Sequence, residues 1–284
     1  MRWAASVVKK AMTHINHTTH QTICATCGTQ YPVGKPLPEL CPICDDERQY
    51  IGDNGQTWTS LATLAKDRAI RFSQIRDGLY DLRITPAFAI GQRAFLILSE
   101  SGNVLWDCLP FLDEPTIAFI RSVGGLNAIV ISHPHYYSLM AEWAKVFDCP
   151  VYIHQNDAVW VQNPTPAVTF WTGERNELWD GMAIINTGGH FPGSCVLIQP
   201  DASGKTNLLT GDTIYVARSR RLVTFMYSYP NLIPLPKKAI EQIRDRLDGV
   251  SFDCIYGAFE GMVIPANGRA VFDASIQRYL SIFE

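Results

Sequence analysis

The sequence has no apolar stretch long enough to cross a membrane. Its longest apolar runs, such as residues 128–131 and 150–153, fall far short of the roughly 18 residues that a transmembrane helix needs. It also has no excess of basic residues: 24 lysines and arginines stand against 27 aspartates and glutamates, a net charge of −3. We therefore expect neither a membrane anchor nor a general attraction to nucleic acid.

Two common phosphate-binding motifs are absent, and so is a recognisable secretion signal. Neither GxGxxG nor GxxxxGK[ST] occurs, so we do not expect the usual glycine-rich cradles for nucleotides. Residues 3–8 are too few for the apolar core of a signal peptide, and two lysines follow them instead of preceding them. A cytoplasmic protein with reduced cysteines is the expectation.

Four of the eight cysteines form two CxxC pairs, which are Cys24 with Cys27 and Cys41 with Cys44. Two such pairs present four thiolates that can close a tetrahedron around one metal ion. The segment between the pairs is rich in proline and glycine and cannot form a core, so the ion would serve as one. We predict a zinc-ribbon-like module with a structural zinc ion over residues 20–50, called the four-cysteine module below. Iron in a rubredoxin-like knuckle and a redox pair are the alternatives.

The other four cysteines occur singly among apolar residues, where we expect small core side chains and not disulfides. They are Cys108, Cys149, Cys195 and Cys254. A polar, glycine-containing stretch follows the four-cysteine module and is typical of a linker. We therefore divide the chain into an N-terminal extension (1–19), the four-cysteine module (20–50), a linker and connecting segment (51–76) and one large domain (77–284).

The large domain alternates short apolar segments with helical patterns. The apolar segments are rich in valine, isoleucine and leucine and are bounded by turn-forming residues, as strands are. We predict strands at residues 77–84, 93–100, 103–108, 127–132, 150–154, 182–187, 194–200, 206–211 and 252–257, and helices at 114–123, 138–147, 155–161, 236–247 and 268–282. Hairpin-length gaps occur beside strand–helix–strand units, so we expect an α/β sandwich with both parallel and antiparallel contacts.

Residue types that bind metals follow several of these strands directly. His133 and His135 follow one strand, His190 follows another after a Gly-Gly turn, and Asp212 follows a third. The large domain has only four histidines, and three of them stand at strand ends. Neutral imidazoles together with a carboxylate make a metal site with an open coordination position. We expect His154, the fourth histidine, to start a helix or to support the site from outside.

The order of these motifs resembles the metallo-β-lactamase superfamily over residues 77–284. The shared pattern is an aspartate after an early strand, an HxHxDH-like loop, a histidine after Gly-Gly and an aspartate in a Gly-Asp pair. In this sequence the pattern falls on Asp107, His133, His135, His190 and Asp212. The resemblance implies an αββα sandwich with a metal site at one edge between the two sheets. It also implies that the three histidines hold a first metal ion and that Asp212 is shared with a second.

Three ligands of the family's second metal ion are missing here. Tyr137 stands where the HxHxDH loop has its aspartate, and Ser138 stands where it has its last histidine. Residues 255–261, which resemble the family's final histidine loop, contain no histidine. A phenol with a pKa of about 10 stays protonated at neutral pH, so tyrosine is a weak replacement. We therefore expect one ion, zinc or iron, with Asp212 as its fourth ligand or as the base for bound water.

Aromatic and basic side chains near these motifs are candidates for contacting the substrate. Tyr137, or Tyr136 beside it, would donate a hydrogen bond to a developing oxyanion; packing of both against the following helix is the alternative. Phe191 follows the third histidine directly. Arg218 belongs to residues 217–230, which the resemblance places at the pocket mouth; a solvated turn is the alternative. We predict a catalytic role for Tyr137 and substrate contacts for the other three.

Three functions remain open from the sequence. A mononuclear metallo-hydrolase would attack a small ester, lactone, thioester or amide with metal-bound hydroxide. A mononuclear iron oxidoreductase, similar to sulfur dioxygenases, would use two histidines and a carboxylate. A catalytically idle ligand sensor or scaffold is the third. The hydrolase is our prediction, with a small-molecule substrate, no membrane or nucleic-acid partner, and an oligomeric state left open, a homo-oligomer included.

Overall fold

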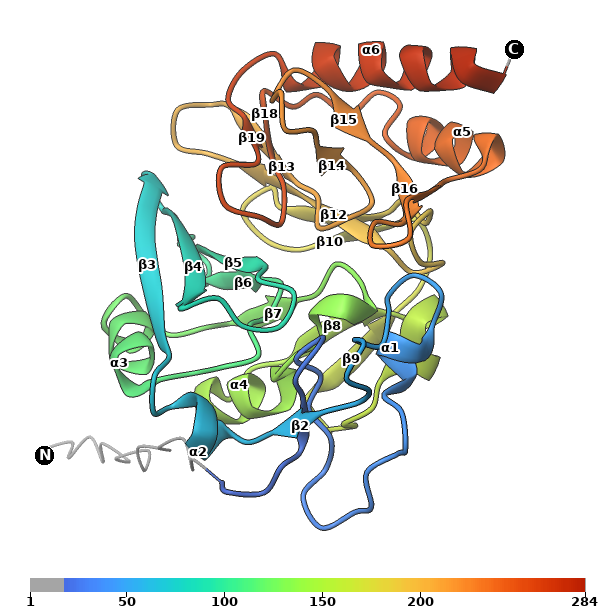
Figure 1. Cartoon of the computed structure of the whole chain (residues 1–284). Coiled ribbons are helices and arrows are strands. Elements are labelled where there is room, and N and C mark those ends of the chain that lie inside the picture. Colours follow the sequence, from blue (N-terminus) through green and yellow to red (C-terminus); the bar gives the residue numbers. More distant parts are fainter. Residues whose placement is uncertain (1–17, 284) are drawn as a thin grey trace, which may run out of the picture.

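Two β-sheets lie face to face, and helices cover the outer side of each (Figure 1). The computed structural model describes residues 18–283 of the chain. The first sheet has seven strands in chain order: β3 (Ala69–Arg76), β4 (Leu79–Thr85), β5 (Arg93–Ile97), β6 (Val104–Trp106), β7 (Ala128–Val130), β8 (Val151–His154) and β9 (Val168–Trp171). The pairs from β3 to β6 are antiparallel and those from β6 to β9 are parallel, so both expected kinds of contact occur.

The second sheet has six strands. Between its fourth and fifth strands, which are neighbours in the sheet, the chain leaves the sheet and returns to it. Its order is β10 (Arg175–Glu177), β11 (Ala183–Asn186), β12 (Cys195–Pro200), β13 (Thr206–Leu209), β18 (Cys254–Tyr256) and β19 (Val263–Ile264). Because β13 and β18 pair in parallel, the chain between them has to cross over. The crossover contains two small hairpins, formed by β14 (Tyr215–Val216) with β15 (Val223–Thr224) and by β16 (Met226–Ser228) with β17 (Ile233–Pro234).

Side chains that alternate along each strand divide between two apolar layers. In β5, Ala94 and Leu96 pack under the helices, whereas Phe95 and Ile97 pack between the two sheets. Strand β12 alternates in the same way between the sheet interface and the opposite helices. Three buried apolar layers therefore hold four structural layers together. This is the αββα sandwich that the motif order implied, and the expected fold class is confirmed.

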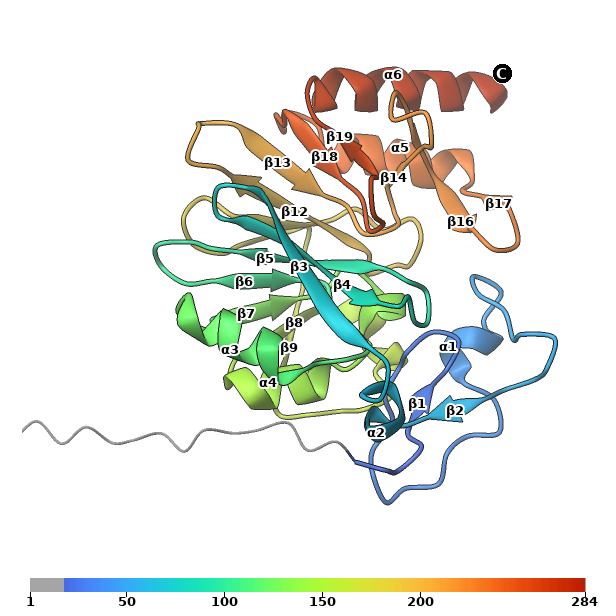
Figure 2. The same ribbon diagram turned by 60° about the vertical axis from the view of Figure 1, so that its left-hand side comes forward.

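The helices lie outside the sheets. Helices α3 (Glu114–Ser122) and α4 (Met140–Phe147) cover the seven-stranded sheet, and α5 (Lys237–Arg246) and α6 (Gly268–Leu280) cover the six-stranded one (Figures 1 and 2). Asp113 begins α3 as an N-cap, because its side chain accepts a hydrogen bond from the Thr116 amide. The expected helix at 155–161 is the 3₁₀ segment η2 (Gln155–Trp160). No helix among the described residues has the length and apolarity to cross a membrane.

The four-cysteine module lies against one end of the sandwich (Figure 2). It contains β1 (Ile23–Cys24) and the short helix α1 (Pro42–Asp45), and β1 pairs with β2 (Trp58–Thr59). Gly28 has a φ of 80°, and a Cβ there would lie 2.4 Å from Cβ of Pro110 in the sandwich. A glycine at this position therefore lets the first CxxC turn pack directly onto the main body.

The structure differs from the linker that we predicted over residues 51–76. This segment contains β2, the short helix α2 (Leu61–Leu64) and the whole of β3, which pairs with β4 along the edge of the first sheet. Ile70 is the only buried residue of β3, so the strand lacks the apolar pattern that marks the others. The sheet therefore starts at residue 69. The predicted N-terminal extension, residues 1–19, lies outside the described residues except for its last two positions.

Candidate metal centres and cavity

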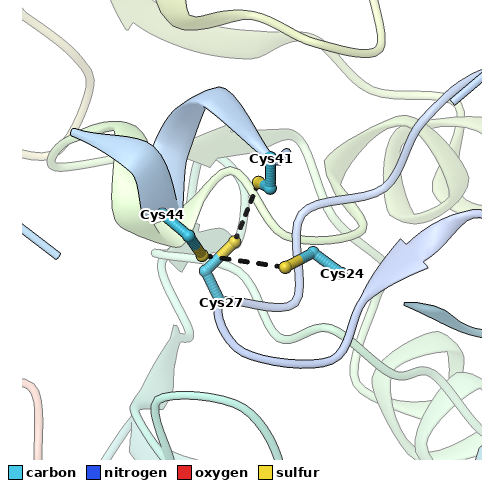
Figure 3. A group of neighbouring side chains, drawn as sticks. All are labelled: Cys24, Cys27, Cys41 and Cys44. Carbon is cyan, nitrogen blue, oxygen red and sulfur yellow. Dashed lines mark hydrogen bonds between the residues drawn. The ribbon is translucent and has the colours of Figure 1, made fainter. Parts of the chain in front are cut away.

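The four cysteines of the CxxC pairs meet at one point (Figure 3). Cys24 ends β1 and Cys27 follows in the next turn, whereas Cys41 precedes α1 and Cys44 lies within it. The Sγ atoms of Cys24 and Cys44 are 3.7 Å apart, as are those of Cys27 and Cys41. Zinc–sulfur bonds of about 2.3 Å in a tetrahedron set the sulfurs about 3.8 Å apart. The cluster therefore has the size of a four-thiolate metal site.

Polar side chains next to this cluster donate hydrogen bonds to two of its sulfurs. The Tyr31 hydroxyl donates to Sγ of Cys41 at 3.1 Å, and Nε2 of Gln56 donates to Sγ of Cys24 at 3.3 Å. Hydrogen bonds from the three neighbouring thiols lower the pKa of Cys24 well below its ordinary range, whereas burial raises the pKa of Cys27 well above it. All four cysteines are buried and free of disulfides. These residues fit a structural metal ion.

A second group of metal-binding side chains gathers where three strands end. Donor atoms from His133, His135, His190 and Asp212 all lie within 4.8 Å of one another, and all four residues are buried. The first two histidines flank the start of the 3₁₀ turn η1 (Pro134–Tyr136) after β7, whereas His190 follows β11 and Asp212 follows β13. The structure thus brings together all four residues that we predicted as ligands of the catalytic metal.

The imidazoles present ring nitrogens to a shared space. Nδ1 of His190 donates to the Met226 carbonyl at 3.1 Å, so its Nε2 carries a lone pair, and this atom lies 3.2 Å from Nδ1 of His135. Nδ1 of His133 lies 2.8 Å from Oγ of Ser132, and its buried Nε2 makes no hydrogen bond with the described residues. Nitrogens bound to one zinc ion lie about 3.3 Å apart. The spacing and the unpaired buried nitrogen both fit a metal ion.

The charge states of these side chains suit a divalent ion. Burial lowers the pKa of His190 to about 3 and the pKa of His135 well below its ordinary value, so both rings are neutral. Burial alone would raise the pKa of Asp212. Contacts with His133, His190 and Tyr136 outweigh burial and leave that pKa below the usual value. Neutral imidazoles beside an ionised carboxylate form a donor set that zinc and iron both accept.

Gly211 and Asp107 help the ends of the strands to pack together at this site. Gly211 has a φ of 54°, and a Cβ at this position would lie 2.4 Å from Oγ of Ser132. The glycine before Asp212 therefore makes room for the histidine loop. Asp107, at the end of β6, accepts a hydrogen bond from the Ser132 amide at 2.8 Å, and burial raises its pKa to about 7. Asp107 thus stabilises the backbone of the loop that carries His133 and His135.

The two tyrosines after His135 have different partners. The Tyr137 hydroxyl donates to the backbone carbonyl of Asp157 at 3.2 Å. The Tyr136 hydroxyl donates to Oδ1 of Asp212 at 2.6 Å. Tyr136 is therefore the tyrosine that reaches the ligand group, whereas the catalytic role of Tyr137 stays a prediction.

A cavity of about 280 Å³ opens onto the histidine site. His135, His190 and Asp212 form part of its wall. The rest of the lining comes from segments far apart in the sequence and consists of Thr26, Arg48, Gln49, Tyr50, Ala89, Ile90, Tyr215, Tyr229, Pro230 and Phe259. This volume is at the lower end for ligand pockets, so the cavity suits a small molecule.

The predicted substrate contacts do not belong to this lining. Tyr136 and Phe191 are fully buried behind it, and Arg218 is exposed in the turn between β14 and β15. The structure instead places Arg48 at the cavity, within a polar stretch after the second CxxC pair that carries no functional motif. Tyr229, in contrast, belongs to the lining and lies inside the segment 217–230, which the family resemblance places at the pocket mouth.

Comparisons with known proteins agree with this architecture. Residues 89–248, more than half of the chain, match the sequence model of the Metallo-beta-lactamase superfamily. Over 261 residues the chain is 44% identical to the uncharacterized protein YmaE of Bacillus subtilis, and the match covers 91% of this chain and 95% of YmaE.

Solved structures show the same fold at low sequence identity. The metallo-β-lactamase DIM-1 has a TM-score of 0.54 and 13% identity, covering 75% of this chain and 95% of DIM-1. A metallo-β-lactamase from Pontibacter korlensis has a TM-score of 0.52 and 15% identity, covering 75% of this chain and 98% of that one. Family match, fold and motif order coincide: the chain belongs to the metallo-β-lactamase superfamily.

Proposed function

We propose that the protein is a hydrolase that uses one metal ion at the histidine site to cleave a small ester, lactone, thioester or amide. The observation that supports it most directly is the buried convergence of three imidazoles and the Asp212 carboxylate at the wall of a cavity. His133, His135 and His190 would hold the ion, and the four-cysteine cluster would hold a structural zinc ion. A divalent ion at the histidine site supplies Lewis acidity and lowers the pKa of a coordinated water to about 7.

In this proposal, Asp212 either accepts a proton from water or binds the ion. Its Oδ2 lies 3.4 Å from Nε2 of His133, on the side where the ring nitrogens converge. Tyr136 holds the other carboxylate oxygen, and the Tyr229 hydroxyl donates to the Asp212 backbone carbonyl at 2.8 Å. These two bonds fix the carboxylate. Its other oxygen, Oδ2, is then placed to bind the ion or to accept a proton from water.

The cavity walls indicate the kind of acyl compound that would fit. Tyr215, Tyr229 and Phe259 contribute aromatic surface, whereas Arg48 is the one arginine or lysine of the lining among the described residues. Asp46 pairs with the Arg48 guanidinium through a contact of 2.6 Å, so little uncompensated positive charge faces the cavity. We infer a small substrate with an apolar face, and no requirement for a strongly anionic group.

Replacing Tyr136 with phenylalanine is expected to lower kcat roughly 10- to 100-fold. The change removes a hydrogen bond to an ionised carboxylate, and such bonds contribute about 1.5–3 kcal/mol. Asp212 would then keep its charge but lose its fixed orientation. Steady-state kinetics on the best substrate, together with the metal content of the same sample, measures the effect.

Tyr137→Phe is the matched control, because it removes the same hydroxyl from the adjacent and equally buried residue. Its hydroxyl contacts only a backbone carbonyl among the described residues, so we expect kcat within about twofold of the native value. Equal turnover in both variants would contradict the role given to Tyr136. A loss confined to Tyr137→Phe would restore the role predicted from the sequence.

The reaction type is tested by loading the protein with zinc or with iron. We expect the zinc-loaded protein to hydrolyse at least one member of a panel of small esters, lactones, thioesters and amides. His190→Ala should abolish that turnover, because it removes a ligand of the ion. Oxygen consumption on thiols by the iron-loaded protein, without hydrolysis, would favour an oxidoreductase. Tight binding of small molecules without turnover would favour a sensor.

A further inference from the structure

The segment after the second CxxC pair lies over the histidine site. Arg48, Gln49 and Tyr50, together with Thr26 from the first CxxC turn, contribute four residues to the cavity lining. The four-cysteine module and the metal-binding strands therefore form a single pocket. No residue of the module belongs to the donor group itself, so its contribution is to the shape and support of the site.

Arg48 connects the module to a predicted metal ligand through a hydrogen bond. Its NH1 donates to the backbone carbonyl of His190 at 3.3 Å. Its guanidinium carbon lies 3.9 Å from the ring centre of Phe191, and the rings of Trp160 and Tyr227 are each 5.2 Å away. Stacking of this kind is specific to the flat guanidinium of arginine. One side chain thus holds both His190 and the residue after it.

Phe191 in turn packs against all three histidines of the site. Its ring centre lies 5.0 Å from that of His135, 5.2 Å from that of His190 and 5.9 Å from that of His133. Phe191 is only 1% exposed, so it cannot shift without moving its neighbours. Arg48 covers Phe191 from the module side and thereby fixes the surface on which all three imidazoles pack.

The module is anchored so that Arg48 stays in place. Asp46 accepts hydrogen bonds from Nε and NH2 of Arg48 at 2.6 and 2.9 Å. The Tyr227 hydroxyl donates to the Glu47 carboxylate at 2.7 Å. Nδ2 of Asn231 donates to the backbone carbonyls of Glu47 and Gln49 at 2.9 and 3.0 Å. These bonds fix the backbone on both sides of Arg48, four residues after the last cysteine of the cluster.

We propose that Arg48 is a positioning residue that couples the four-cysteine module to the histidine site, by holding His190 and Phe191 where the ion must bind. The inference rests on metal binding at that site, which is part of the proposed function, but not on hydrolysis. Residues outside the ligand set that orient ligands commonly change metal affinity roughly 10- to 100-fold. We expect a loss of that size in Arg48→Ala.

The test measures affinity at each site of the full-length protein by titration with Co²⁺. Cobalt bound to thiolates shows charge-transfer absorption that cobalt bound to imidazoles lacks, so the two sites are read separately. Arg48→Ala should weaken the imidazole site and leave the thiolate site unchanged. Arg68→Ala is the matched control, since Arg68 also pairs with a nearby aspartate and is partly buried, but it lies outside the cavity lining. Its affinities should equal those of the native protein.

Arg48→Lys separates a loss of charge from a loss of stacking. Lysine keeps the charge but cannot lie flat on Phe191, so its histidine site should stay weaker than in the native protein. If Arg48→Ala also loses the thiolate signal, the module has unfolded, and the lysine variant decides the matter. Native affinity at the histidine site in the variant that keeps its thiolate signal would overturn the proposal. If the native protein binds cobalt at the imidazole site but hydrolyses nothing, the proposed hydrolase activity is wrong, whereas the coupling through Arg48 is unaffected.

Discussion

Replacing His133 and His135 together with alanine is expected to lower the bound metal from two ions per chain to one. The change removes two of the three imidazoles that converge on the site, whereas the four-cysteine cluster lies in a separate part of the chain. The remaining His190 and Asp212 cannot bind an ion tightly enough to retain it on dilution, because zinc sites in enzymes need three protein ligands. Metal content per chain, measured by mass spectrometry on the native and variant proteins, gives the result directly.

The same double variant should lose hydrolytic turnover about a thousandfold or more, since the Lewis acid supplies several kcal/mol of transition-state stabilisation. His154→Ala is the matched control. His154 is also a buried histidine at the end of a strand, but its Nε2 bonds to the Gly173 carbonyl at 3.0 Å and it is not one of the four ligand residues. That variant should retain both ions. One ion per chain in the native protein, unaffected by loss of the two histidines, would contradict the metal site.

The convergence of the four candidate ligands was predictable because each follows a strand whose apolar pattern is strong. His133 comes three residues after β7 and Asp212 three residues after β13, and the strand residues next to them are buried. A short buried strand fixes where the chain emerges, so the side chains just beyond it are placed by local sequence. The two CxxC pairs were predictable for a similar reason, since the turn itself sets the distance between the sulfurs.

The orientation of the tyrosines could not be derived in this way. Tyr136 and Tyr137 are adjacent, and the 3₁₀ turn η1 decides which hydroxyl reaches Asp212. The alignment of the loop with the family's HxHxDH motif pointed to Tyr137. The structure places the Tyr136 hydroxyl at the Asp212 carboxylate and the Tyr137 hydroxyl at the Asp157 carbonyl, a difference between adjacent residues that composition cannot reveal.

The contribution of the four-cysteine module to the cavity was equally invisible in the sequence. Its partners Tyr227 and Asn231 lie about 180 residues further along the chain. The stretch from Asp45 onward is polar and contains glycines, which is the signature of a linker. Strand β3 lacks a predictive apolar pattern because it is an edge strand with one buried residue. In each case long-range packing outweighs a weak local pattern.

Replacing Cys41 and Cys44 with serine is the second change from which we expect a large effect. Beyond the four cysteines, the buried residues of the module's own apolar cluster are Tyr31 and Ile43, so a bound metal ion would be the greater part of its core. Structural zinc contributes about 10–16 kcal/mol of binding free energy in small zinc-folded domains, and most of this stabilises the fold. We expect the module to unfold while the sandwich, which has three apolar layers of its own, stays folded.

Limited proteolysis should then cut the variant within residues 20–50, and far-ultraviolet circular dichroism should retain the signal of the sheets. The ion at the histidine site should remain but yield to weaker chelators, because Arg48 no longer covers Phe191. Cys149→Ala is the control, since it removes a buried thiol that belongs to neither group of candidate metal ligands and should leave both ions in place. An intact module without its thiolates would mean that the bonds of Tyr227 and Asn231 hold it without metal. If instead the module unfolds while the histidine site keeps its full affinity, the two centres are independent, and the coupling through Arg48 is wrong.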